Sequence, residues 1–435
     1  MQIQRIRKMM SGLLALCLGL TLGAVTPGIA SAQEPALAGA TLFQDVKTYS
    51  DFGVHRYGST GEQQALAWIS KELAAAGLKV ERQPLQMGRQ LVVDKARVSL
   101  GDQTVDAFPL WWPPEHEGPV VLDSVLKPDD DAAGAIAWLR LPYERGAYLN
   151  AQHRQKIMEL ATHKPLAILL TIANPAGSIF TYNVTQEDAP WPMPVILVPA
   201  RLAADLEAGR KSGLKVGIEL ATRVEREVAS YNVIGRIDHG ADRTIVVSTP
   251  VSSWFTSSCE RGPGIALFLA MARHAASRKD DVNYLFVATV GHEIGHGGME
   301  AFLHAKAPPP EKVRAWLHFG ASLACYGWKK DAAGGPPTRL SQPDPALRVL
   351  LASESIQALT ARVFAEIPAT PYLGAQSGVG ELRDVRAAGY ANYFGMAGIH
   401  RYFHTPEDRL DLTGPELLAP LAEKFAQELD GLAAH

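Results

Sequence analysis

The sequence predicts an α/β fold whose main sheet is flanked by helices and interrupted by an inserted β-rich domain. Three consecutive segments in the second half of the chain carry this prediction. Thr244 to Ser248 is a short β-branched run, Gly264 to Ser277 is an apolar segment of helix length, and Tyr284 to Val290 is a second buried-strand run. Strands that alternate with helices in this way are typical of a sheet with crossover helices.

The remaining elements of the main domain follow from capping and periodicity. Ser59 and Thr60 before Glu62 predict a capped helix that runs to Gly77. The other expected elements are strands over 78–83 and 315–319, a helix over 345–366 opened by Asp344, and a closing helix over 415–432 behind Thr413.

The first residues have the pattern of a secretory signal peptide. Arg5, Arg7 and Lys8 precede an apolar stretch over 9–25, and Ala30-Ser31-Ala32 supplies a small-residue cleavage site. We expect cleavage after Ala32, so residues 1–32 are the predicted signal and the mature protein is periplasmic or secreted. An uncleaved membrane anchor is the alternative, but no later segment is apolar enough to span a bilayer.

The charge balance of the mature chain argues against nucleic-acid binding. The whole chain has 42 basic and 45 acidic residues, and the signal removes three cations and no anion, which leaves a net charge of −6. The 403 residues after the signal exceed the usual size of a single core and indicate two domains.

The second domain is expected over residues 91–227, between the two parts of the main domain at 33–90 and 228–435. This stretch has short β-like runs and many prolines. It resembles the protease-associated domain, a small β-rich module inserted in several exopeptidases. Its expected elements are strands over 134–139, 166–172, 195–198 and 214–220 and helices over 154–162 and 200–213.

Four motifs give the chain a resemblance to a known family. They are Ser253-Trp254, Gly264-Ile265-Ala266, Gly291-His292-Glu293-Ile294-Gly295 and His404-Thr405-Pro406-Glu407-Asp408. In this order they resemble the zinc aminopeptidase and glutamate carboxypeptidase family, which also contains glutaminyl cyclase and transferrin receptor. The resemblance covers nearly the whole mature chain and implies a zinc-exopeptidase-like mixed sheet.

The resemblance implies metal-assisted hydrolysis at an altered metal centre. The family holds two zinc ions with five ligands, and three of those positions fall on Glu260, Glu293 and His404. Two carboxylates and one imidazole suit a catalytic zinc with an open fourth position. The resemblance therefore implies one zinc ion in this protein.

The second zinc position is lost in this sequence. The early His of the family falls on Pro250, and the Asp that orients it falls on Ser252. The second ligand Asp falls on Gly320 or Ala321. None of the residues at the two ligand positions, Pro250 and Gly320 or Ala321, has a side chain that can coordinate a metal.

The general-base position of the family falls on His292. A neutral imidazole can accept a proton from an activated water. His292 could also be a metal ligand or an inert packing residue, and the sequence leaves these three roles open.

Two other catalytic classes are less well supported. Residues 292–296 spell the His-Glu-x-x-His motif of zincins, which requires a continuous helix. A buried strand ends almost at His292, and Gly295, Gly297 and Gly298 weaken such a helix. The serines at 252, 253, 257 and 258 lie outside any Gly-x-Ser-x-Gly elbow, which argues against a serine hydrolase.

The mature chain keeps two cysteines, Cys259 and Cys325. In an oxidising compartment they could form a disulfide or remain two buried thiols, and Cys259 could also be a soft zinc ligand. The sequence does not choose between these states.

The leading functional hypothesis is an exported zinc-dependent exopeptidase-like hydrolase with one metal and His292 as base, and the favoured kind is an aminopeptidase that cleaves N-terminal residues from peptides. One alternative is a catalytically inactive relative that acts as a binding protein, as transferrin receptor does in the family. The other is a glutaminyl cyclase with one zinc. The sequence predicts no oligomeric state.

Overall fold

The fold is built on a ten-stranded mixed sheet. The computed structural model describes residues 35–332, 335–367, 372–373 and 379–434, so the predicted signal peptide at 1–32 lies outside the described residues. The strand order is β15-β14-β16-β11-β9-β10-β8-β1-β2, and β4 pairs with β8 beside this path. The strands are β1 (Lys79–Leu100), β2 (Gln103–Asp106), β4 (Val120–Val125), β8 (Lys215–Ile237), β9 (Thr244–Pro250), β10 (Asn283–Thr289), β11 (Val313–Phe319), β14 (Arg348–Ala352), β15 (Tyr372–Leu373) and β16 (Tyr393–Gly398).

The centre of this sheet is parallel. β9 pairs in parallel with β10 on one side and with β11 on the other, and β11 pairs in parallel with β16. The predicted strands over 244–248, 284–290 and 315–319 are confirmed to within two residues at each end. Because strand order reverses at β9, the carboxyl ends of these strands border the place where α/β sheets usually bind ligands.

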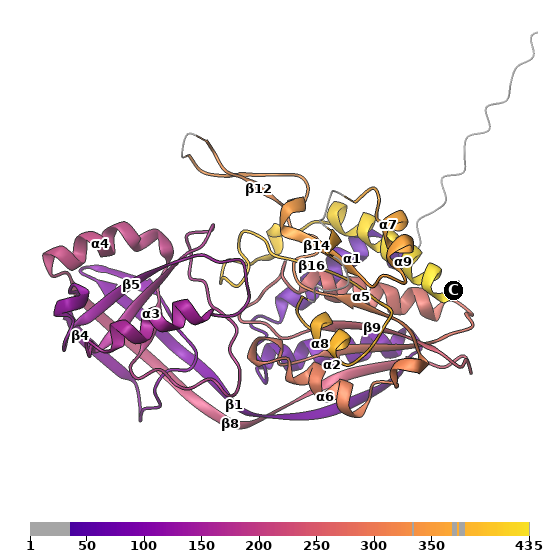
Figure 1. Ribbon diagram of the computed structural model, residues 1–435, viewed down its shortest axis with the longest axis horizontal. Coiled ribbons are helices and arrows are strands. Elements are labelled where there is room, and N and C mark those ends of the chain that lie inside the picture. The colour runs from indigo at the N-terminus through magenta and orange to yellow at the C-terminus, as the bar shows by residue number, and fades with distance from the viewer. Residues whose placement is uncertain (1–34, 333–334, 368–371, 374–378, 435) are drawn as a thin grey trace, which may run out of the picture. The chain divides into compact units, whose positions relative to one another are not determined.

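Helices cover both faces of the sheet (Figure 1). Alternate side chains of β9 face opposite layers: Ile245 and Val247 pack with α1, α5 and α9, whereas Val246 packs with α6 and α8. None of the described helices combines the length and apolarity needed to cross a bilayer. The helices are α1 (Gly39–Asp51), α2 (Thr60–Ala75), α3 (Ala151–Ala161), α4 (Ala203–Ser212), α5 (Gly262–Ala276), α6 (Gly297–Ala305), α7 (Gln357–Val363), α8 (Leu382–Ala387) and α9 (Pro415–Ala434).

Helix α2 begins as the sequence predicts. The Oγ atom of Ser59 accepts a hydrogen bond from the backbone N–H of Glu62 at 3.3 Å, and the Glu62 carboxylate accepts one from the N–H of Gly58 at 2.6 Å. Glu62 is fully buried and also accepts a hydrogen bond from Ser230. Burial raises the pKa of Glu62 to about 8, so at neutral pH this carboxyl carries a proton in the folded protein.

The raised pKa of Glu62 makes the protein less stable as the pH rises. Between the ordinary value of 4.5 and about 8, the unfolded chain releases this proton and the folded chain keeps it. We expect this difference to remove on the order of 3 kcal/mol of unfolding free energy between pH 5 and pH 8. Urea unfolding at both pH values should show a smaller loss in Glu62→Gln than in the wild type. The matched control is Glu366→Gln at an exposed carboxylate, and an equal pH dependence in all three proteins would contradict the expectation.

The region between β1 and β8 has a sheet of its own. Both long strands run from the main sheet into this region side by side (Figure 1), and both cross the boundaries expected at residues 91 and 227. The expected strands and helices of the region are present, and its identity as a protease-associated domain stays a prediction. The second sheet has the order β3-β7-β6-β5, formed by β3 (Phe108–Pro109), β5 (Ile136–Pro142), β6 (Ala167–Ala173) and β7 (Val195–Leu197).

The prediction of one helix over 345–366 is wrong. Asp344 does cap a helix, since its side chain accepts a hydrogen bond from the N–H of Ala346, but this is the three-residue 3-10 helix η6 (Pro345–Leu347). The chain then forms β14, which pairs antiparallel with β16, and only α7 is helical. Pairing of residues 348–352 with β16 therefore outweighs the helical preference of this segment. A small hairpin of β12 (Trp328–Lys329) and β13 (Thr338–Arg339) precedes this segment.

Candidate functional site

The predicted site residues lie at the carboxyl ends of the central parallel strands. Ser252 follows β9, Glu293 follows β10, and Gly320 follows β11. Glu260 lies in the loop between β9 and α5, and His404 lies in the loop after β16. The sheet therefore brings together residues that are more than 140 positions apart in the chain.

An arginine lies between the two predicted carboxylate ligands. Nη2 of Arg261 is 2.7 Å from Oε1 of Glu293 and 3.1 Å from Oε1 of Glu260. Its Nε donates a hydrogen bond to the carbonyl oxygen of Ser252 at 3.0 Å. Only 2% of Arg261 is exposed, so a buried guanidinium holds the two carboxylates in one cluster.

Glu260 is held rigidly by its own backbone. Its N–H and that of Cys259 donate to the two carboxylate oxygens of Asp408 at 2.9 and 2.8 Å. The carbonyl oxygen of Glu260 accepts a hydrogen bond from the N–H of Ser322 at 2.8 Å. Neither side-chain oxygen of Glu260 accepts a hydrogen bond from any described residue, so its carboxylate interacts with the neighbouring charges alone.

His404 faces the same carboxylate. Its Nδ1 lies 3.0 Å from the carbonyl oxygen of Thr181, which leaves Nε2 directed toward Glu260, 3.5 Å from Oε1. Thr181 belongs to the region between β1 and β8, so that region orients the imidazole.

The electrostatics of the cluster follow from burial and from Arg261. Burial alone would raise the pKa of Glu260, but the charges of Arg261 and His404 lower it to about 2. Burial raises the pKa of Glu293 despite the contact with Arg261. The arginine stays protonated beside the two carboxylates, because their charges raise its pKa further. The cluster thus holds two acids and one permanent cation.

The residues of this cluster do not fit a zinc ion in the predicted way. The ligand atoms of Glu260, Glu293 and His404 do not all lie within 4.8 Å of one another. Both oxygens of Glu293 are engaged, one by Arg261 and the other by the hydroxyl of Ser252 at 2.9 Å. A guanidinium at this point already supplies the positive charge that the two carboxylates require, and it would repel a divalent cation.

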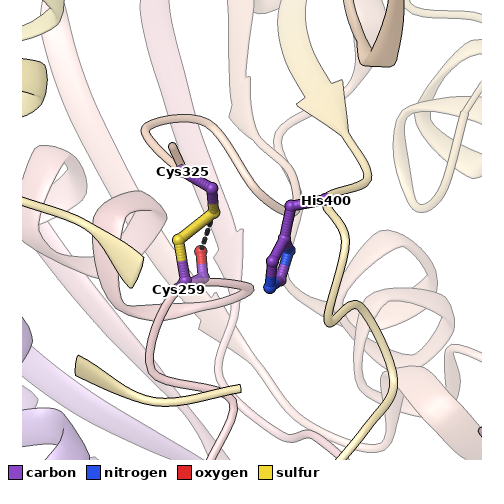
Figure 2. Close-up of side chains that lie close together, drawn as sticks. All are labelled: Cys259, Cys325 and His400. Atoms are coloured by element: carbon purple, nitrogen blue, oxygen red, sulfur yellow. Dashed lines mark hydrogen bonds between the residues drawn. A yellow bond between two sulfur atoms is a disulfide. The ribbon is translucent and has the colours of Figure 1, made fainter. Parts of the chain in front are cut away.

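One set of three ligand-type side chains in the described part of the chain does lie within 4.8 Å: Cys259, Cys325 and His400. Figure 2 shows the two cysteines joined in a disulfide with the imidazole of His400 beside it. Metal ligation requires thiolates, and both sulfur atoms are bonded to each other. This set is therefore a disulfide with a neighbouring histidine, and of the states open from the sequence the disulfide is the one observed.

The positions of the second zinc are unsuited to any ligand. Pro250 is the last residue of β9 and pairs with Thr289. A Cβ atom at Gly320 would lie 2.8 Å from the Cβ of Ala397 and 2.9 Å from the carbonyl oxygen of Met396, so a side chain does not fit there without movement.

His292 pairs with an acid that the sequence analysis did not identify. Its Nδ1 lies 3.2 Å from Oε1 of Glu381, and its ring stacks on that of His296 with 4.5 Å between centroids. Burial lowers the pKa of His292 well below its usual value, so the imidazole is neutral. Burial also raises the pKa of Glu381 to about 7.

The zincin alternative is wrong for this chain. Residues 292–294 form the short 3-10 helix η4 (His292–Ile294), and Gly295 and His296 have φ values of 108° and 59°. The continuous helix that would place both histidines on one face is therefore absent from this described segment.

A cavity of about 270 Å³ opens beside the cluster. Arg145, Arg261, His292 and His318 contribute its polar part. Burial lowers the pKa of His318 to about 3, so this ring is neutral as well. The walls are mainly apolar, formed by Leu347, Val349, Val379, Ala397, Ile399 and Phe403. The cavity suits a small apolar group bound next to a charged one.

Sequence reasoning missed Arg261, the residue that decides the chemistry of the cluster. Its signal was its place directly after Glu260, where a positive charge adjoins a predicted metal ligand. Glu381 could not be identified in the same way, because it reaches His292 from α8's N-terminal side, 89 residues away.

Comparison with known proteins gives a structural answer only. No protein-family model matches the sequence, and no curated protein matches it significantly. Among solved structures, the Peptidase M28 precursor from Shewanella amazonensis SB2B has a TM-score of 0.69 at 17% identity, over 91% of this chain and 93% of that one. The zinc aminopeptidase BSAP from Bacillus subtilis has a TM-score of 0.66 at 16% identity, over 91% and 95%.

The chain has the zinc-aminopeptidase fold. An aminopeptidase from Aneurinibacillus sp. strain AM-1 agrees, with a TM-score of 0.60 at 17% identity over 92% of this chain and 94% of that one. The predicted fold class is confirmed, and the neighbours are of the kind that the sequence motifs resemble. At such identities the zinc-aminopeptidase fold is established, whereas the activity has to be argued from the site.

Proposed function

We propose that this protein is a metal-free peptide-binding protein built on the zinc-aminopeptidase fold. The observation that carries the proposal is the guanidinium of Arg261, 3.1 Å from Glu260 and 2.7 Å from Glu293. An internal cation takes the part that a metal would play in holding these acids together. This is the sequence-based alternative of an inactive relative, now with a stated physical basis.

The ligand class follows from the charge and shape of the cavity. The charged residues that line it are Arg145 and Arg261, and the carboxylates of Glu260 and Glu293 are not among its lining residues. The two guanidinium groups can donate hydrogen bonds to the carbonyl oxygens of a peptide, and the apolar walls accept an aliphatic side chain. A peptide with an apolar first residue combines both features.

The competing proposal is the zinc aminopeptidase, with Glu260, Glu293 and His404 around one zinc and His292 as base. The contact of 3.5 Å between His404 and Glu260 favours it, as do the Glu260 oxygens that accept no hydrogen bond among the described residues. It requires Arg261 to leave both carboxylates, which breaks a buried ion-pair cluster. The glutaminyl cyclase proposal has the same requirement.

We also propose that the chain is exported. The disulfide between Cys259 and Cys325 is of the kind that persists in the periplasm or outside the cell. The signal-like pattern of residues 1–32 supports the same compartment.

The test combines metal content with peptide binding in the purified mature chain. We expect zinc well below one atom per chain after dialysis without chelator, and no hydrolysis of the tripeptide Leu-Ala-Ala. Calorimetry should nevertheless detect binding of Leu-Ala-Ala and a loss of at least about tenfold in affinity for Gly-Ala-Ala, because glycine has no side chain to fill the apolar part of the cavity. One zinc per chain together with hydrolysis would establish the competing proposal instead.

A blocked cavity provides the control. Ala346 is an exposed residue on the wall of the cavity, so Ala346→Trp should abolish binding of Leu-Ala-Ala without unfolding the protein. Val121→Trp places the same side chain at a site that is 64% exposed in β4, outside the cavity, and should bind the peptide normally. Equal binding by both variants would exclude this cavity as the peptide site.

A further inference from the structure

A second cavity, of about 340 Å³, adjoins the one beside the carboxylate cluster. The two cavities share Arg145, Leu347 and Ile399 as lining residues. The charged residues that line the first are Arg145 and Arg261. The second is more basic, since Arg145, Arg348, Arg401 and Lys330 line it and Asp344 is the single acid among its lining residues. The second cavity therefore suits the anionic end of a ligand that also reaches the first.

Arg348 is the buried centre of this basic cavity. Only 3% of it is exposed, at the first position of β14. Nη1 donates a hydrogen bond to the carbonyl oxygen of Leu323 at 2.8 Å, while Nε is buried without a partner among the described residues. None of the described carboxylates lies within 4 Å of its guanidinium, so this is a buried cation without a counter-ion.

An unpaired buried arginine is costly unless an anion reaches it. Burial lowers the pKa of Arg348 to about 10, which still leaves it charged at neutral pH. A buried charge normally has a partner of opposite sign, because desolvation is otherwise uncompensated. The missing partner is therefore expected to come from a ligand.

The surrounding groups reinforce this requirement. The guanidinium of Arg401 lies over the ring of Trp328 at 5.6 Å, and its Nε is buried without a hydrogen-bond partner in the described structure. Asp344 does not neutralise the cavity, because its single negative charge stands against the four cations that line it.

His400 does not change the charge balance of the basic cavity. Its Nδ1 lies 3.0 Å from the hydroxyl of Ser322, and its Nε2 lies 3.5 Å from Oδ1 of Asp408. Asp408 in turn accepts the two backbone N–H groups of residues 259 and 260. The excess of positive charge in the cavity therefore remains.

We propose that this basic cavity binds the C-terminal carboxylate of a short peptide whose first residue occupies the neighbouring, mainly apolar cavity. The inference rests on the proposed function and specifies its ligand as a short peptide with a free C-terminus. Arg348 and Arg401 bind the carboxylate, and Arg145 lies at the wall that the two cavities share.

The test compares Leu-Ala-Ala with its C-terminal amide by calorimetry on the mature chain. We expect the amide to bind at least about tenfold more weakly to the wild type, because it lacks the charge that Arg348 and Arg401 recognise. In Arg401→Gln the two peptides should bind with nearly equal affinity. Arg348→Gln should show the same pattern, and Arg401→Gln keeps the test valid if the buried variant does not fold. Lys329→Gln is the matched control, since Lys329 is exposed and does not line the cavity.

The outcomes separate this inference from the proposed function. Equal binding of acid and amide to the wild type would overturn the carboxylate site and leave the peptide-binding proposal in place. If neither peptide binds, inorganic phosphate is titrated into the wild type and Arg401→Gln. Phosphate binding that is lost in the variant would support an anion site without a peptide function, and no phosphate binding would overturn the anion site as well.

Discussion

Arg261→Ala is expected to lower the free energy of unfolding by about 3–5 kcal/mol, as measured by urea denaturation. The substitution leaves the carboxylates of Glu260 and Glu293 buried next to each other without their shared cation. The desolvation cost of both charges is then uncompensated, and their mutual repulsion adds to it. One or both must take up a proton for the chain to fold.

The same variant should gain an affinity for zinc that the wild type lacks. With the guanidinium gone, Glu260, Glu293 and His404 are free of their internal cation. Zinc at about 100 times its dissociation constant would return roughly 2.7 kcal/mol of stability to Arg261→Ala. Thermal unfolding with and without zinc should therefore shift in the variant and stay unchanged in the wild type.

Arg273→Ala provides the matched control. Arg273 also contacts two carboxylates, those of Asp45 and Glu72, but its side chain is 22% exposed. We expect a loss of about 1 kcal/mol and no response to zinc, because water and salt screen the charges left behind. A wild type that zinc stabilises, or an Arg261→Ala protein as stable as the wild type, would contradict the view that Arg261 replaces a metal.

Much of the fold could be predicted because its signals are local. The strands over residues 244–250, 283–289 and 313–319 each contain at least three consecutive apolar residues, which is typical of strands buried on both faces. The start of α2 was visible because Ser59 and Glu62 have the spacing of a capped helix. The same locality explains the error at 345–366, where pairing of β14 with β16 depends on a strand more than 40 residues away.

The site could be predicted only in part, because its chemistry depends on where long side chains end. The motifs placed Glu260, Glu293 and His404 near one another, and His404 does approach Glu260. The sequence does not reveal that the guanidinium of Arg261 donates a hydrogen bond to the carboxylate of Glu293, 32 residues further along the chain. Likewise, the sequence does not reveal that Arg348 is buried, with only 3% of the residue exposed.

Replacement of both cysteines, in Cys259→Ala/Cys325→Ala, is expected to lower the free energy of unfolding by about 4 kcal/mol. The disulfide closes a loop over 66 residues, so its loss increases the conformational freedom of the unfolded chain. Both sulfur atoms are buried, and alanine leaves no unsatisfied polar group in their place.

The disulfide also holds the loops beside the two cavities in place, so its loss should affect ligand binding. It ties the loop that carries Glu260 to the loop after β11, where Ser322 donates to the Glu260 carbonyl and Cys325 lines the basic cavity. We expect weaker binding of Leu-Ala-Ala by the double variant, because the two cavities are then no longer held at a fixed distance from each other. Urea denaturation with dithiothreitol should weaken the wild type to the level of the variant and leave the variant unchanged. If reduction leaves both the stability and the peptide affinity of the wild type intact, the disulfide has neither role.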